Sequence, residues 1–376
     1  MNFELNEEQQ LLADSLKRYL EKDYDFEARK KIIASATGCS DAVWSTFAEM
    51  GLLGLALSDA QGGFGGGAGD LHSVMDALGQ ALVVEPFLST VTVAHLIDRA
   101  GSEAQKKSVL PAVIEGKCKL ALATEEAQAR YDLTQVSTSA KRDGAGWVLD
   151  GAKVAVVDAP SADHILVSAR TSGKAGDADG ISLFLVARGA AGMTLKTFRT
   201  QDNARAADLT LKGVKVGADA LVGAEGKGLA ALEEAVDFGT VLQCSEAVGV
   251  MQSACDATLE YLKTRKQFGV AIGSFQALQH RMVDMIVSTE QARSITYLAA
   301  SKVDGGAADA AERKRFVSAA KVKISEAARH VGQEAVQMHG GMGITLEMKV
   351  AHSFKRLTMI GLTFGDADHH LERFAA

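Results

Sequence analysis

An arginine at the head of a polar turn is the most chemically informative feature of this sequence. Arg265 ends a predicted helix over 242–264, where the helix dipole favours a positive charge. The turn contains Gly269 and Gly273, and a second predicted helix opens at Ser274, whose hydroxyl can cap it. The composition of this stretch alone predicts either a helical hairpin with a polar turn or an arginine presented to a ligand.

A pair of glycines ends another predicted helix, over 311–338. The segment from Gln337 to Gly343 reads Q-M-H-G-G-M-G. Adjacent glycines let another molecule approach the backbone closely, which would give Gly340 and Gly341 a binding role. A glycine that simply terminates the helix is the alternative explanation.

Acidic residues and a histidine pair complete the set of candidate site residues. Glu246 lies in a mostly apolar part of the helix predicted over 242–264, so it is either a partly buried functional group or an ion-paired structural one. Asp366 and Asp368 are further acidic candidates near the C-terminus. His369 and His370 point to different faces because they are adjacent, and no third ligand is evident, so we predict no metal site.

Composition argues against several classes of protein. The 376 residues are 47% hydrophobic, which suits a large core in two or three domains. With a net charge of −7 and no basic block, no nucleic-acid partner is expected. No apolar run reaches the ~18 residues of a membrane span, and the acidic N-terminus lacks the apolar core of a signal peptide. Scattered cysteines without a C-x-x-C pair fit reduced thiols in a cytoplasmic protein. They are Cys39, Cys118, Cys244 and Cys255.

The spacing of apolar residues changes twice along the chain. Helical spacing over 1–119 gives way to short strand-like runs over 120–225, and the helical period returns over 226–376. We therefore predict three domains with these bounds, the middle one a small β-barrel or sandwich. The helices predicted before the strands cover 7–24, 41–53, 71–82, 92–99 and 104–115. The predicted strands cover 120–124, 137–140, 147–149, 154–157, 164–168, 181–186, 194–196 and 207–211.

The order R-x-Q-F-G-x-x-I-G-x-F-Q-x-x-Q from Arg265 to Gln279 resembles the acyl-CoA dehydrogenase family of flavoenzymes. The predicted layout is similar to that family's fold, which has an N-terminal helical domain, a middle β-barrel and a C-terminal four-helix bundle. The resemblance implies FAD as the cofactor. It also implies that Arg265 binds the FAD pyrophosphate across a subunit interface, since a guanidinium matches phosphate oxygens bidentately. The implied cofactor-binding residues are Thr124, Arg265, Gln267, Phe268, Phe275, Gln276, Gln337, Gly340 and Gly341.

Two segments depart from the family's pattern. The family's T-E-P-x-A-G-S-D segment, which holds the flavin ring and substrate, shrinks here to Thr124-Glu125-Glu126, without the proline, glycine and serine. Residues 153–158 lack the aromatic residue and threonine that commonly cover the flavin. Whether this chain holds its own FAD is therefore left open, whereas Arg265 and the Gly340–Gly341 pair, which by the resemblance would serve the neighbour's pocket, are intact.

The family's usual catalytic carboxylate is also missing. Phe364 stands where many members carry a glutamate, and Gly239 stands at the earlier helical position that some relatives use. If the chain is catalytic, another acid must take the proton. We predict Glu246 as this base, with Asp366 and Asp368 as alternatives. The G-D-x-D-H-H-L ending and the position of Glu246 resemble bacterial members that act on CoA thioesters of steroid side chains.

The resemblance implies FAD-dependent α,β-dehydrogenation of an acyl-CoA thioester. A carboxylate removes the α proton, and the β hydrogen passes as hydride to the flavin. Electron-transferring flavoprotein is the implied oxidant, and a homotetramer or an α2β2 heterotetramer is the implied assembly. A non-catalytic partner subunit that completes a sister chain's FAD site stays open as a second function. An oxidase also stays open, because oxygen reactivity depends on access to the pocket.

Overall fold

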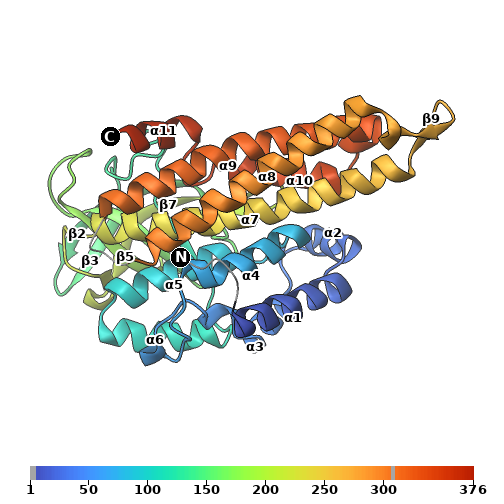
Figure 1. Cartoon of the computed structure of the whole chain (residues 1–376). Helices are drawn as coiled ribbons and strands as arrows, with labels where there is room; N and C mark the ends of the chain where they lie inside the picture. The colour runs from blue at the N-terminus through green and yellow to red at the C-terminus, as the bar shows by residue number, and fades with distance from the viewer. Residues whose placement is uncertain (1–5, 306–309) are drawn as a thin grey trace. The chain divides into compact units, whose positions relative to one another are not determined.

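Helices come first along the chain, then strands, then helices again (Figure 1). The computed structural model describes residues 6–305 and 310–376, so residues 1–5, on which the expectation of no signal peptide partly rests, lie outside it. The helices before the sheet are α1 (Glu7–Asp23), α2 (Phe26–Ala34), α3 (Asp41–Glu49), α4 (Ala68–Ala81), α5 (Phe87–Ala100) and α6 (Glu103–Ile114). The strands of the sheet are β1 (Leu120–Ala123), β2 (Ser139–Asp143), β3 (Gly146–Val157), β4 (His164–Arg170), β5 (Ile181–Ala187), β6 (Met193–Arg199), β7 (Arg205–Val216) and β8 (Leu221–Val222). The helices after it are α7 (Leu229–Thr264), α8 (Gln276–Val303), α9 (Ala310–His339), α10 (Lys349–Ile360) and α11 (Ala367–Ala375).

The chain packs into two compact units that do not follow its linear order. Unit 1 combines Met1–Lys31, Gly67–Val83 and Thr240–Ala376, and unit 2 combines Ile32–Gly66 and Val84–Gly239. Helices α1 and α4 thus belong with the C-terminal helices, whereas α3, α5 and α6 belong with the strands. The division into three domains at residues 119 and 225 stays a prediction.

Unit 2 is built on one sheet of eight strands among the described residues, in the order β6-β7-β3-β2-β4-β5-β8, with β1 parallel to β4. The longest pairing is antiparallel, between β3 and β7. Its register shifts between Lys153 and Val156, where Ala155 takes a left-handed backbone with φ of 52°. Large side chains such as Trp147 and Phe184 fill the core of this unit and touch edge to face.

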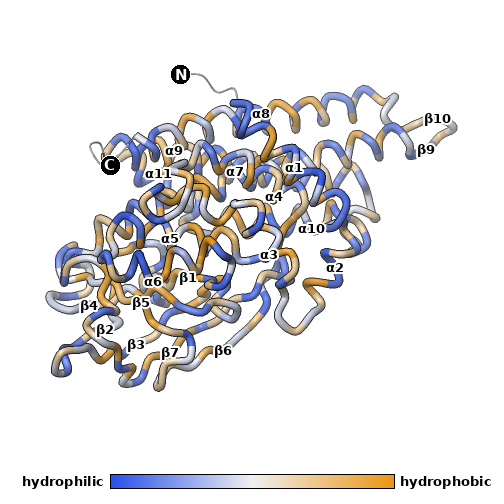
Figure 2. Tube along the Cα trace, turned by 90° about the horizontal axis from the view of Figure 1, so that it is seen from below, coloured by the Kyte–Doolittle hydropathy of each residue, from blue (hydrophilic) through white to orange (hydrophobic). Residues whose placement is uncertain are grey.

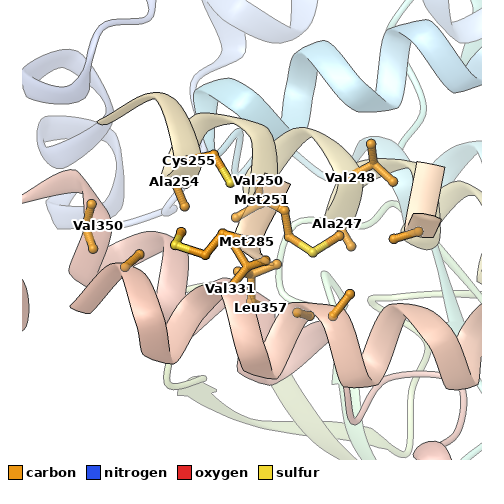
Figure 3. Packing of buried hydrophobic residues seen from close by; sticks show 14 of the residues in the cluster. Ala247, Val248, Val250, Met251, Ala254, Cys255, Met285, Val331, Val350 and Leu357 are labelled. Atoms are coloured by element: carbon orange, nitrogen blue, oxygen red, sulfur yellow. The ribbon is translucent and has the colours of Figure 1, made fainter. Parts of the chain in front are cut away.

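Unit 1 is a helical bundle. Side chains of α7 from Thr240 onward, α8, α9 and α10 interlock in one apolar core that includes Val250, Met251, Met285, Val331 and Leu357 (Figure 3). Hydrophobic and hydrophilic residues alternate along these long helices (Figure 2), as expected for helices with one buried face.

Helices α4 and α7 cross at very short range within unit 1. A Cβ added at Gly249 of α7 would lie closer than 3.0 Å to the backbone oxygen of Asp76 in α4. A Cβ added at Gly79 of α4 would likewise lie closer than 3.0 Å to the backbone oxygen of Glu246 in α7. Glycine at both positions therefore lets the two backbones meet without side chains between them.

The connection between α7 and α8 differs from the predicted turn. It is a hairpin of two short strands, β9 (Lys266–Gln267) and β10 (Val270–Ala271), at the far end of both helices (Figure 1). Ser274 does not cap α8, because its Oγ donates a hydrogen bond to Ala271 and Phe275 precedes the helix. Within residues 6–305 and 310–376, no helix is both long and apolar enough to cross a membrane.

Candidate functional site

Arg265 is presented to the outside by the end of α7 and the β9–β10 hairpin. Its N–H donates to the Tyr261 carbonyl at 2.8 Å, and its carbonyl accepts from Ile272 N–H at 2.9 Å, so the backbone is fixed on both sides. Within the described part of the chain, no hydrogen bond or ion pair engages the exposed guanidinium. The backbone therefore positions a cation that is available for an anionic ligand.

The tip of the hairpin carries an aromatic residue in an unusual backbone conformation. Phe268 and Gly269 have φ of 54° and 82°, the signs required by the two central residues of a tight type I′ turn. A phenylalanine rarely adopts this region, and such strained residues are frequent at ligand sites. The Phe268 side chain is 92% exposed and meets Phe275 edge to face, with ring centroids 6.2 Å apart.

The remaining predicted cofactor residues of this end are also exposed. Gln267 Nε2 donates to the carbonyl of Lys266, Gln276 begins α8, and Gln337 lies on the outer face of α9. Gly340 has a φ of 61°, and a Cβ added at Gly340 or Gly341 would meet nothing within 4 Å. The backbone here is open, as close approach by another molecule requires.

A ring stack brings the two motifs together. Tyr261, one helical turn before Arg265, lies over His339, which immediately precedes Gly340, with centroids 4.4 Å apart and planes at 26°. The exposed Arg265 guanidinium and the exposed Gly340 backbone thus lie close in sequence to two residues that are in contact with each other. This donor set fits a diphosphate such as that of FAD.

The segment around Thr124 in unit 2 fits a flavin less well. Lys153 is fully buried, and its Nζ donates to Glu126 at 2.8 Å, to Ser168 Oγ at 2.9 Å and to the Thr124 carbonyl at 3.2 Å. Burial alone would raise the pKa of Glu126, but Lys153 and the bonded N–H groups lower it to about 2. These groups satisfy one another's hydrogen bonds and are therefore less available to a flavin.

Glu246 is held by an arginine that the sequence analysis did not identify. Arg356 of α10 donates from Nε and Nη2 to the two oxygens of Glu246, each at 2.6 Å. The side chain of Glu246 is 6% exposed, and that of Arg356 is 19% exposed. Of the two interpretations left open for Glu246, the ion pair is present in the structure, and its role as a base stays a prediction.

A buried lysine braces the helices that carry this ion pair. Lys321 of α9 donates to Gln243 Oε1, one turn before Glu246, and to the carbonyls of Ile360 and Thr363, at 2.9, 2.5 and 2.7 Å. Burial lowers its pKa to about 8. No local pattern in the sequence could have identified Lys321 or Arg356, because their partners lie far along the chain.

Two of the C-terminal candidates, Asp366 and His370, have structural partners. Asp366 caps α11 by accepting from His369 N–H at 2.9 Å, and Asp368 is exposed in the first turn. His370 is buried, with its ring nitrogens against Ser318 Oγ and the Phe364 carbonyl.

Three family models cover nearly the whole chain. They are the N-terminal domain of acyl-CoA dehydrogenase over residues 6–117, the middle domain over 121–214 and the C-terminal domain over 226–376. Acyl-CoA dehydrogenase FadE12 of Mycobacterium tuberculosis is 31% identical, over 82% of this chain and 80% of its own length. The chain belongs to the acyl-CoA dehydrogenase family of oxidoreductases, which confirms the predicted family, enzyme class and fold class.

Two solved structures are similar over their full length. A variant of the Tcur3481–Tcur3483 steroid ACAD is 30% identical, with a TM-score of 0.88 over 98% of this chain and 97% of that one. The ChsE4–ChsE5 complex from Mycobacterium tuberculosis is 26% identical, with a TM-score of 0.90 over 100% and 98%.

Two buried histidines of unit 1 should make the protein sensitive to mild acid. Burial lowers the pKa of His72 to about 4 and that of His370 to about 3, against about 6.5 when unfolded. Between these values the unfolded chain binds protons that the folded chain does not, so stability falls as pH falls. From pH 7 to 5 we expect a loss of about 2 kcal/mol per histidine, measured by urea unfolding. His72→Asn should remove the His72 share of this dependence, whereas the exposed His280→Asn should leave it unchanged. Equal stability of the wild type at both pH values would contradict the prediction.

Proposed function

We propose that this chain takes part in FAD-dependent α,β-dehydrogenation of an acyl-CoA thioester. The observation that carries the proposal is the pairing of the open Arg265 guanidinium with the open Gly340–Gly341 backbone through the Tyr261–His339 stack. Bound FAD supplies the acceptor for the β hydrogen, and the chain's own groups bind the cofactor and remove the α proton. Similarity to a steroid ACAD supports a bulky, steroid-type acyl group as the substrate.

Glu246 is the proposed base. Arg356 donates one hydrogen bond to each of its oxygens, which leaves a second lone pair on each oxygen to accept the proton. The arginine thereby holds the side chain in place. Family resemblance supports electron-transferring flavoprotein as the oxidant.

A second candidate function is that of a non-catalytic partner subunit. Two observations favour it: the clamp on Glu246 and the mutually satisfied Lys153–Glu126 segment, which offers little to a flavin. Such a chain would lend Arg265 and its glycine pair to the FAD site of a sister chain in an α2β2 assembly. Similarity to the two-chain ChsE4–ChsE5 complex supports this assembly, and a homotetramer corresponds to the first function.

Purification from the native host distinguishes the two functions. Native mass spectrometry gives the subunit composition, and absorbance near 450 nm gives the flavin content. An active homomer with one FAD per chain would support the first function, and two kinds of chain sharing fewer flavins would support the second. A colourless homomer without activity would contradict both.

Arg265→Ala should remove most of the FAD from the purified assembly. The substitution deletes the exposed fork but leaves the backbone bonds to Tyr261 and Ile272, so the helical far-UV spectrum should not change. Lys263→Ala removes an equal charge from the exposed last turn of α7 and serves as the matched control. Full flavin occupancy in the Arg265 variant would show that the guanidinium does not bind the cofactor.

A further inference from the structure

The Tyr261–His339 stack links two exposed segments whose own side chains do not fix them. Tyr261 lies in the last turn of α7, four residues before Arg265. Its carbonyl also accepts the Arg265 N–H, at 2.8 Å. On the other side of the stack, His339 is the last residue of α9, and the open glycine turn begins at the next residue. A shift of either ring would therefore move one anion-binding group relative to the other.

His339 is held more firmly than an ordinary helix-terminal residue. Its ring is 3% exposed, and Nδ1–H donates to the Ala335 carbonyl at 2.8 Å, which leaves Nε2 without a proton in the neutral ring. Burial lowers its pKa, so the ring stays neutral at pH 7. The planes of Tyr261 and His339 then stack as two neutral rings.

We propose that the Tyr261–His339 stack is a positioning element that sets the separation between the Arg265 guanidinium and the Gly340–Gly341 backbone, and thereby the affinity for the FAD diphosphate. The inference rests on the proposed function, since it assumes that this end of the bundle binds FAD. It assigns Tyr261 a role through Arg265 rather than a direct contact with the cofactor. A diphosphate spans two anionic centres, so its affinity depends on the distance between the groups that bind it.

The test is FAD titration of the deflavinated assembly containing this chain, followed by flavin fluorescence. Tyr261→Leu keeps an apolar side chain and removes the ring, and it should weaken FAD binding about tenfold or more. Tyr261→Phe keeps the ring and should bind FAD within about twofold of the wild type. Both variants should keep the far-UV spectrum and thermal unfolding of the wild-type apoprotein within a few degrees.

The outcomes separate this inference from the proposed function. If Arg265→Ala loses FAD while Tyr261→Leu binds it normally, the stack has no positioning role and the proposed function stands. If Arg265→Ala also binds FAD normally, this end of the bundle does not hold the cofactor and both fail. A Tyr261→Leu variant that loses its fold would make the stack a general support of the bundle, which overturns the proposal as well.

Discussion

Replacing Gly249 with alanine is expected to lower the free energy of unfolding by about 3 kcal/mol or more. The added Cβ would lie closer than 3.0 Å to the backbone oxygen of Asp76, a distance that real Cβ atoms do not keep. A flexible side chain could move away, but here the obstacle is the backbone of α4. The two helices must separate, and the apolar contacts around the crossing are then loosened.

Chemical denaturation measures this effect directly. Gly79→Ala should cost a similar amount, because its Cβ would meet the Glu246 carbonyl at the same crossing. The double variant should cost less than the sum, since one separation of the helices relieves both clashes. Gly189→Ala is the control, because a Cβ there meets nothing within 4 Å. A Gly249→Ala variant as stable as the control would mean that the crossing is looser than described.

Glu246→Gln is expected to lower turnover by a factor on the order of a hundred or more if this residue is the base. The amide keeps the size of the side chain and one hydrogen-bond acceptor for Arg356, but it cannot take up the α proton. Binding of FAD and acyl-CoA should stay close to normal, because these depend on other groups. Steady-state kinetics with an artificial electron acceptor, together with flavin content, measures both expectations.

The ion pair gives this experiment a second possible outcome. If Glu246 serves only to hold Arg356, the substitution replaces the charged partner of this guanidinium with a neutral amide, so thermal stability falls while turnover is kept. Asp366→Asn is the matched control, since the amide oxygen can still cap α11. Lost turnover in that control, with normal turnover in Glu246→Gln, would move the base to the C-terminal segment. A wild-type chain that is inactive with every partner would favour the non-catalytic subunit.

Local patterns predicted the class of most elements. Helical spacing located α1, α4 and the long helices after residue 226, and strand-like runs located β1 to β7, although the runs at 147–149 and 154–157 are parts of the single strand β3. The two-residue strands β9 and β10 were missed because they are too short to show a period. Helix α2 was missed as well, since its nine residues include no wide apolar stripe.

The site was predictable only where a motif is continuous. Arg265 and Gly340 lie in such motifs, but the stack that joins them depends on how α7 and α9 pack. Glu246 was recognised as ambiguous because its sequence neighbours are apolar. Its partner Arg356 is separated from it by 110 residues, and no local rule relates them. Lys153 and Glu126 form their ion pair because two strands and a loop converge, which periodicity does not encode.

Unit 1 is assembled from three segments that lie far apart in the sequence, and this has a consequence for its synthesis on the ribosome. Helices α1 and α4 are made early, yet the helices they pack with in unit 1 begin at Thr240 and end at the C-terminus. At ~5–20 residues per second, about 15–60 s pass between the synthesis of α4 and that of the last helices of the core that covers its apolar face. During that time Leu71, Val74 and Met75, all buried in the finished unit, have no folded partner from the C-terminal bundle. We therefore expect the early helices of unit 1 to be bound by chaperones that recognise exposed apolar segments, and the stability of unit 1 to be gained only when its C-terminal helices leave the exit tunnel.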